Sequence, residues 1–217
     1  MVKRRKARST SSFKRKKPGR DPKALVLIVC EGKKSEPNYF KALRDDLHLT
    51  TTSVRVVESK QGSAPVNVVN YAKTLIAKEE VDYDRVFCVF DKDNHSTFNS
   101  AQKSLTNFSQ RSRSKIKAII SVPCFELWLL LHFKYTTKQY CQGSMGPSAC
   151  SRVIQDLEKF ISNYEKASSE IYARTKDKLD TAVKNAQKLR EFQKQQNGTK
   201  DPYTEVDKIV EFLRKSS

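Results

Sequence analysis

The sequence lacks the motifs that define several large enzyme classes. It contains no GxxxxGKS or GxxxxGKT segment, which excludes a P-loop nucleotide site, and no GxGxxG turn follows its first apolar run. HExxH and GxSxG segments are also missing, so a zinc-protease helix and a hydrolase nucleophile elbow are excluded. If the activity depends on ATP, we expect a partner protein to use it.

Long apolar runs are missing as well. No stretch approaches the roughly 18–20 apolar residues that a membrane-spanning helix needs. No apolar segment follows the basic residues at the N-terminus, as one would in a secretory signal. We therefore expect a cytoplasmic protein without a membrane partner.

Cysteine is scarce, and its spacing is not that of a metal site. The five cysteines are Cys30, Cys88, Cys124, Cys141 and Cys150. Three of them lie in apolar runs, and none belongs to a CxxC pair, which argues against a structural zinc site. We expect buried free thiols in a reducing cytoplasm.

Acidic residues are outnumbered: 24 Asp and Glu stand against 42 Lys and Arg, for a net charge of +18. Residues 1–20 hold ten Lys and Arg and no acid, and subtracting these ten charges from +18 leaves +8 for the remainder. Clustered basic residues bind nucleic acid because they neutralise phosphates and release counterions.

We predict that residues 1–22 form a basic tail that is too poor in apolar residues to fold alone and that contacts nucleic acid. Its candidate contacts are Arg4, Arg5, Lys14, Arg15 and Lys16. The other interpretation is a tail that raises solubility or adheres weakly to RNA.

Beyond the tail, residues 23–140 alternate between strand and helix patterns. Short apolar or alternating runs predict strands at 24–30, 53–59, 85–90 and 117–122. Apolar residues at helical spacing predict helices at 35–47, from 65, at 96–110 and at 123–133. Ser35 is the expected N-cap of the first helix. The alternation predicts an α/β fold, a parallel sheet flanked by helices, with its site beyond the carboxyl ends of the strands.

Residues 141–217 carry helical patterns without a strand pattern. We predict helices at 148–163, 167–195 and 203–215, separated by loops rich in glycine and proline. The predicted organisation is a basic tail (1–22), an α/β core (23–140) and a helical C-terminal region packed on the core (141–217).

Acidic residues follow two of the predicted strands. Glu31 comes directly after the first strand, Asp91 directly after the third, and Asp93 lies two positions beyond Asp91. Mg²⁺ prefers oxygen ligands and binds through a few carboxylates, water and substrate phosphate. We expect Asp91 and Asp93 to bind a divalent cation, with Glu31 completing the site or acting as a general base. A helix cap or a solvated turn is the other interpretation of each acid alone.

Four further residues are candidates near these acids. Glu126 lies among aromatic residues in the first turn of the predicted helix 123–133, where a buried carboxylate needs a metal, a basic residue or the helix N-terminus as its partner. His95 can ligate a metal, contact phosphate or transfer a proton. Lys33 and Lys34 follow Glu31 and can bind phosphate. Each of these residues also has a purely structural interpretation.

Four segments in a fixed order resemble the RloB-like family over about residues 24–215. They are VCEGKKSEPNYFKAL, VFDKDNH, SVPCFELWLLLHF and DPYTEVDKIVEFL. Members of this family resemble the Toprim domain of topoisomerases, bacterial primases and OLD-family nucleases. The resemblance implies that Glu31 is a general acid/base and possible metal ligand and that Asp91 and Asp93 bind metal. It adds His95 and Glu126 as site residues. Topoisomerases often have a third acid where this chain has His95, which leaves the number of metals open.

The resemblance also implies a function. The chain is expected to be a nuclease dependent on Mg²⁺ or Mn²⁺ that cleaves DNA or RNA, tRNA among the candidates. It is further expected to be an effector of an anti-phage defence system that works with an ATPase partner. The alternatives are a non-catalytic nucleic-acid-binding or adaptor subunit of a defence complex, and a nucleotidyl transferase. The sequence leaves the substrate, the trigger and the oligomeric state open.

Overall fold

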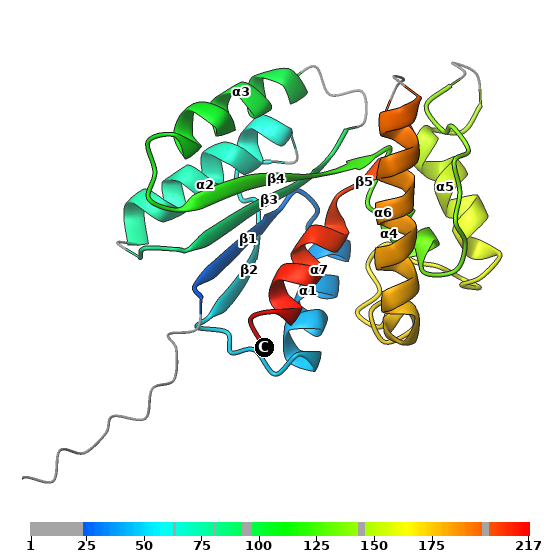
Figure 1. Ribbon diagram of the computed structural model, residues 1–217, viewed down its shortest axis with the longest axis horizontal. Helices are drawn as coiled ribbons and strands as arrows, with labels where there is room; N and C mark the ends of the chain where they lie inside the picture. The colour runs from blue at the N-terminus through cyan, green and yellow to red at the C-terminus, as the bar shows by residue number, and fades with distance from the viewer. Residues whose placement is uncertain (1–23, 63, 80, 93–96, 143–145, 197–199) are drawn as a thin grey trace, which may run out of the picture.

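The structure is a computed structural model that describes residues 24–217, apart from positions 63, 80, 93–96, 143–145 and 197–199. Figure 1 shows a central sheet with helices on both faces and further helices at one end. The sheet has the strand order β2-β1-β3-β4-β5. The strands are β1 (Val26–Cys30), β2 (Val54–Glu58), β3 (Arg85–Asp91), β4 (Lys115–Val122) and β5 (Tyr203–Thr204). The first four run parallel, as predicted, and β5 pairs antiparallel with β4.

The register of the two central strands places their carboxyl ends side by side. Cys30, the last residue of β1, pairs with Val89 of β3, and the backbone N–H of Glu31 donates to the Val89 carbonyl over 2.9 Å. Every residue of β1 is buried, since helices cover both faces of the sheet. Glu31 and Asp91 therefore leave the sheet at the same edge.

Two apolar clusters fill the space between the sheet and its helices. On one face lie α2 (Pro65–Glu79) and α3 (Phe98–Ser109), and on the other lie α1 (Ser35–Asp46) and α7 (Val206–Arg214) (Figure 1). The cluster under α1 and α7 continues through the C-terminal helices. The predicted boundary near residue 140 stays a prediction. Two elements that follow it in the chain, β5 and α7, return to the sheet.

The helix after β4 is shorter than predicted. Instead of 123–133, α4 spans Glu126–Leu131, and residues 123–125 turn the chain from the strand into the helix. The turn points Phe125 into a cluster of rings, where its centroid lies 5.6 Å from that of Tyr39. All six residues of α4 are buried, so Glu126 enters the core as the first residue of a helix without a polar face.

The C-terminal helices differ more from the prediction. The structure has α5 (Ala149–Glu158), a short 3₁₀ helix η1 (Lys176–Lys178) and α6 (Leu179–Gln195). The predicted helix over 167–195 is wrong for 167–175, which form turns, because Ile171 and Tyr172 pack into the core and the Tyr172 hydroxyl donates to Asp46 over 2.9 Å. The predicted helix at 203–215 divides into β5 and α7.

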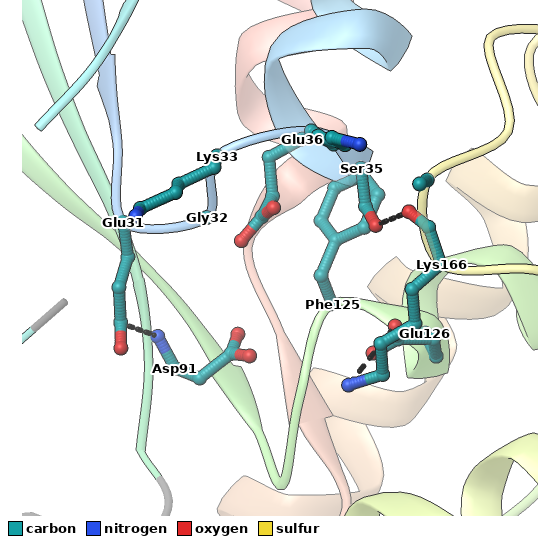
Figure 2. Close-up of a pocket in the computed structure, with 11 residues that line it drawn as sticks. Glu31, Gly32, Lys33, Ser35, Glu36, Asp91, Phe125, Glu126 and Lys166 are labelled. Carbon is teal, nitrogen blue, oxygen red and sulfur yellow. Dashed lines mark hydrogen bonds and ion pairs between the residues drawn. The ribbon is translucent and has the colours of Figure 1, made fainter.

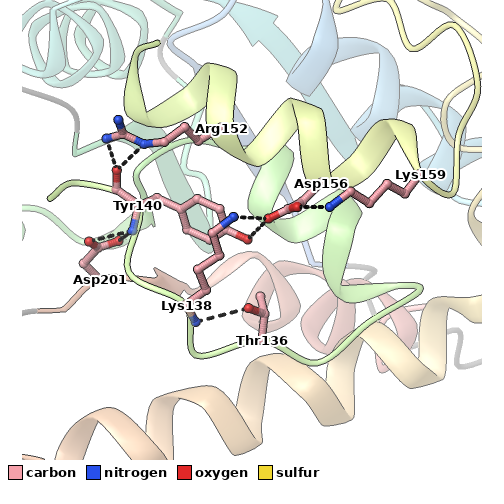
Figure 3. A network of polar contacts seen from close by, with 7 residues as sticks. All are labelled: Thr136, Lys138, Tyr140, Arg152, Asp156, Lys159 and Asp201. Carbon is pink, nitrogen blue, oxygen red and sulfur yellow. Dashed lines mark hydrogen bonds and ion pairs between the residues drawn. The ribbon is translucent and has the colours of Figure 1, made fainter. Parts of the chain in front are cut away.

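A polar network fixes the segment after α4 against α5 (Figure 3). The Asp156 carboxylate accepts from Lys138 and Lys159 over 2.7 Å and from the Tyr140 hydroxyl over 3.1 Å. At the other end, the Asp201 carboxylate accepts from the backbone N–H of Tyr140 over 3.0 Å. The network ties α5 and the chain before β5 to one segment.

The N-cap prediction for Ser35 is wrong. Lys34 occupies the N-cap of α1, with no capping hydrogen bond from its side chain. Ser35 is the first residue of the helix, and its hydroxyl donates instead to the backbone carbonyl of Lys166. The hydroxyl is used for a contact between distant segments, which no local pattern reveals.

Among the described residues, no helix has both the length and the apolar composition that crossing a membrane requires.

Candidate functional site

A pocket of about 340 Å³ lies at the carboxyl ends of β1 and β3 (Figure 2). Four carboxylates line it, from Glu31, Glu36, Asp91 and Glu126. Three lysines also line it, Lys33, Lys34 and Lys166. The pocket thus combines four acidic side chains with three basic ones, in a protein whose overall charge is strongly positive.

Glu31 and Asp91 are joined directly. The backbone N–H of Asp91 donates to Oε2 of Glu31 over 2.9 Å, so the Glu31 side chain reaches from the end of β1 to the end of β3 (Figure 2). Asp91 is the last residue of β3 and is partly exposed. The sequence predicted this convergence, because parallel strands deliver their carboxyl ends to one edge.

The environment of Asp91 disfavours its charged form. Although Asp91 keeps some exposure to solvent, desolvation of its carboxyl group raises its pKa well above its ordinary value, and the neighbouring carboxylates of Glu36, Glu126 and Glu31 raise it further. A proton or a metal cation relieves this repulsion. The hard oxygen donors and the concentration of negative charge fit a divalent cation such as Mg²⁺ or Mn²⁺.

Glu36 lines the pocket, although the sequence alone favours for this first-turn glutamate a role in stabilising the helix N-terminus over a place near the site. It is buried in the first turn of α1, and burial, together with the nearby Glu126 carboxylate, raises its pKa. Gly32 leaves room for this carboxylate: a Cβ at Gly32 would stand 1.9 Å from Oε2 of Glu36, so the Glu36 side chain would have to move. The glycine turn after β1 therefore lets the Glu36 carboxylate approach the backbone.

Glu126 has several protein partners. Its carboxylate accepts from the Tyr164 hydroxyl over 3.2 Å and from the Cys150 thiol over 3.3 Å. The Lys166 ammonium lies 3.5 Å from Oε1 of Glu126. The expectation that a buried carboxylate at this place needs partners is therefore met by a hydroxyl, a thiol and a basic residue.

Lys166 is a residue that sequence reasoning missed. It lies in the turns after α5, and two contacts hold these turns to the start of α1: Ser35 to the Lys166 carbonyl, and Asn38 Nδ2 to the Ala167 carbonyl over 3.4 Å. Although burial opposes it, the Glu126 carboxylate raises the pKa of Lys166, which keeps the ammonium charged. No local signal identifies this lysine, because its place depends on long-range packing.

The remaining candidates divide into two groups. Lys33 and Lys34 are exposed at the pocket. Asp93, His95 and the tail residues Arg4, Arg5, Lys14, Arg15 and Lys16 lie outside the described residues, so their roles stay predictions.

His132, by contrast, is structural. It is buried, its ring centroid lies 4.9 Å from that of Trp128, and burial lowers its pKa to about 4.

Comparisons with known proteins identify the family. No curated protein and no solved structure matches the chain. A family model described as RloB-like protein matches residues 26–213, which include nearly every described element and the whole pocket. The chain therefore belongs to the RloB-like protein family.

Proposed function

We propose that this protein is a metal-dependent nuclease with a Toprim-like core that hydrolyses phosphodiester bonds in DNA or RNA. The observation that carries the proposal is a pocket lined by four carboxylates and three lysines, in which Glu31 and Asp91 lie at the carboxyl ends of two adjacent parallel strands and Glu36 and Glu126 come from the starts of α1 and α4. Such a concentration of acids would repel a nucleic acid unless a cation neutralised it. The net charge of +18 supports a polyanionic substrate.

Asp91 and Glu31, with Asp93 from the segment that follows β3, are the residues proposed to hold Mg²⁺ or Mn²⁺. A bound divalent cation would supply polarisation of the phosphate and stabilisation of the leaving oxygen. Glu31 is proposed to move the proton as water adds to phosphorus and the ester bond breaks. The backbone N–H of Asp91 orients the Glu31 carboxylate for this role.

The lysines are proposed to bind the substrate backbone. Lys33 and Lys34 are exposed in the turn between β1 and α1, where they can pair with phosphates on either side of the scissile bond. Lys166 stands across the pocket on a separate segment (Figure 2). The tail would add charge without sequence specificity.

The cellular role is proposed from family membership. The resemblance to RloB-like proteins implies a place in anti-phage loci that also encode an ATPase, and this chain has no P-loop motif of its own. We propose that it is the effector of such a system and that an ATPase partner controls it.

The test compares cleavage by the wild type with cleavage by Asp91→Asn. Labelled single-stranded DNA, double-stranded DNA and tRNA are incubated with Mg²⁺, Mn²⁺ or EDTA. Asp82→Asn, which changes an exposed carboxylate away from the pocket, is the matched control. We expect Asp91→Asn to lose about 10²-fold or more of the rate while its circular dichroism is unchanged, and Asp82→Asn to cleave normally.

Cleavage by Asp91→Asn at the wild-type rate would contradict the proposal. Tight nucleic-acid binding by the wild type, without cleavage under any metal and with the ATPase partner present, would instead favour the adaptor function. A requirement for nucleoside triphosphates as substrates would indicate nucleotidyl transfer.

A further inference from the structure

Two cysteines and a glutamate meet beside the pocket. Cys124 lies in the turn before α4, Glu126 is the first residue of α4, and Cys150 lies in the first turn of α5. Their sulfur and carboxylate oxygen atoms all lie within 4.8 Å of one another. No sequence spacing indicates this cluster, because its members come from two segments that pack together only in the folded chain.

The donor set differs from that of the acidic site. Two thiolates and a carboxylate suit a borderline-soft cation such as Zn²⁺, whereas Mg²⁺ and Mn²⁺ prefer oxygen alone. Zinc bonds of about 2.0–2.3 Å place tetrahedral ligand atoms about 3.3–3.8 Å apart. A contraction of about 1 Å would therefore bring the three donors onto one ion.

A positive charge already stands beside these donors. The Lys166 ammonium donates to Cys150 Sγ over 3.3 Å and lies 3.5 Å from Oε1 of Glu126. The Lys166 side chain is 59% exposed, whereas that of Glu126 is 4% exposed. The Lys166 ammonium can therefore move into solvent while the Glu126 carboxylate stays fixed. A metal cation can then occupy the place of the ammonium.

Two of the three donors are buried, while Cys150 is partly exposed. Cys124 is buried, and the Tyr164 hydroxyl donates to Glu126, which fixes the orientation of its carboxylate.

We propose that Cys124, Glu126 and Cys150 form a second metal site, for Zn²⁺ or a similarly thiophilic divalent cation. Three protein ligands leave the fourth position for water or for a group that enters from the pocket, which Glu126 also lines. This site shares Glu126 with the pocket of the proposed nuclease, but its two cysteines do not line that pocket, and neither Glu31 nor Asp91 contributes to it, so it does not rest on the proposed activity.

The test uses the metal alone, Co²⁺ followed by Zn²⁺, on the reduced, metal-free full chain. A cobalt–thiolate bond gives a charge-transfer absorption in the near ultraviolet, which a carboxylate or lysine site does not give. We expect this band to saturate at one Co²⁺ per chain and to disappear when Zn²⁺ displaces the cobalt. Excess Mg²⁺ should leave it unchanged.

Variants assign the band to its ligands. Cys150→Ser, at a partly exposed position, removes one of the two thiolates and should reduce the band to about half or less, and Glu126→Gln should weaken cobalt binding. Cys141→Ser, at the exposed cysteine outside the cluster, and Asp91→Asn should both retain it. Lys166→Ala should bind the metal more tightly, because the competing ammonium is gone.

Two results would overturn the proposal. One is a folded wild-type chain that gives no thiolate band at any cobalt concentration. The other is a band of equal strength in Cys150→Ser. Because the readout is spectroscopic, loss of cleavage in Asp91→Asn with an intact band separates this site from the proposed nuclease site.

Discussion

At the end of β3, desolvation first and three neighbouring carboxylates second raise the pKa of Asp91. The position of Asp91 in the sheet keeps its carboxyl group in these surroundings, where ionising the group costs free energy. Strongly perturbed acids that gather in a pocket are typical of functional sites. The surroundings of this one residue are therefore the main support for metal-dependent chemistry.

The pH dependence of stability should show this cost. Because the pKa of Asp91 is raised in the folded state, the metal-free protein should lose stability as pH rises from the ordinary aspartate pKa through the raised one. Asp91→Asn lacks this loss, so it should melt at a higher temperature than the wild type at neutral pH, with a smaller difference near pH 4. Each kcal/mol corresponds to about 2–4 °C in a chain of this size.

Thermal melts from pH 4 to pH 8, with and without Mn²⁺, measure how the melting temperatures of the wild type and Asp91→Asn depend on pH. Added Mn²⁺ should raise the melting temperature of the wild type and not that of Asp91→Asn. A wild type that exceeds Asp91→Asn in stability at neutral pH without metal would contradict the assignment.

Gly32 gives a second prediction at this scale. Gly32→Ala places a methyl group on the Glu36 carboxylate, so the carboxylate must move and activity should fall by about 10-fold or more. In a Glu36→Ala background the same change should cost nothing further, because the atoms it meets are gone. A double-mutant cycle on cleavage rate and on stability measures the coupling. Equal losses from Gly32→Ala in both backgrounds would show that Glu36 is not the cause.

At the scale of the elements, the sequence predicts the sheet well and the C-terminal part less well. Apolar runs locate β1 to β4, because a strand buried on both faces needs a continuous apolar segment. The strand β5 has two residues, too few to carry a periodic pattern. The turns at 167–175 could not be predicted either. Polar residues interrupted by spaced apolar residues, as in this segment, are equally compatible with a helix.

The candidate site divides in the same way. Glu31 and Asp91 are predictable because each lies at the carboxyl end of a strand, Glu31 directly after β1 and Asp91 as the last residue of β3, and their convergence follows from the parallel topology. Glu36 and Lys166 are not predictable, since the first depends on a backbone approach at Gly32 and the second on packing between distant segments. Cys150 joins Cys124 for the same long-range reason.

The network around α5 gives a prediction at this scale. Although burial opposes it, hydrogen bonds from Lys138, Lys159 and Tyr140 lower the pKa of Asp156 to about 2. The stabilisation is present above the ordinary aspartate pKa of about 3.9 and is lost as pH falls toward 2. Asp156→Asn should therefore lower the free energy of unfolding by about 1–2 kcal/mol at pH 7, because solvent screens part of the interaction, with a smaller difference near pH 3.

Urea unfolding at both pH values measures this effect. Asp180→Asn is the control. The Asp180 side chain is 77% exposed and pairs with Arg214, and exposed ion pairs of this kind contribute about 0–1 kcal/mol to the free energy of unfolding. Equal losses in the two variants at pH 7 would contradict the role given to the network.

At the scale of the whole molecule, charge distribution decides how the protein meets its substrate. The acidic pocket is a local exception in a chain of net charge +18, of which residues 1–20 supply ten positive charges. Basic surface attracts a polyanion over a distance comparable to the Debye length, about 8 Å in physiological salt. The local acids then determine where a cation, and with it the scissile phosphate, can bind.

The salt dependence of nucleic-acid affinity measures how much the basic tail contributes to binding. Replacing Arg4, Arg5, Lys14, Arg15 and Lys16 by Ala should weaken binding to DNA and RNA in EDTA and make the plot of log affinity against log salt shallower. On duplex DNA the slope should change by about 0.9 for each phosphate that the tail no longer neutralises. Replacing Lys184 and Lys194, exposed on α6, is the control. A slope unchanged by the tail substitutions would show that the tail does not bind phosphates.

The most direct measurement of the central claim is a calorimetric titration of the substrate-free protein with Mn²⁺ and Mg²⁺. We predict millimolar or tighter binding to the wild type and its loss in Asp91→Ala/Asp93→Ala, with Cys150→Ser unaffected. Equal heats in the wild type and the double variant would contradict a metal site at the carboxyl end of β3.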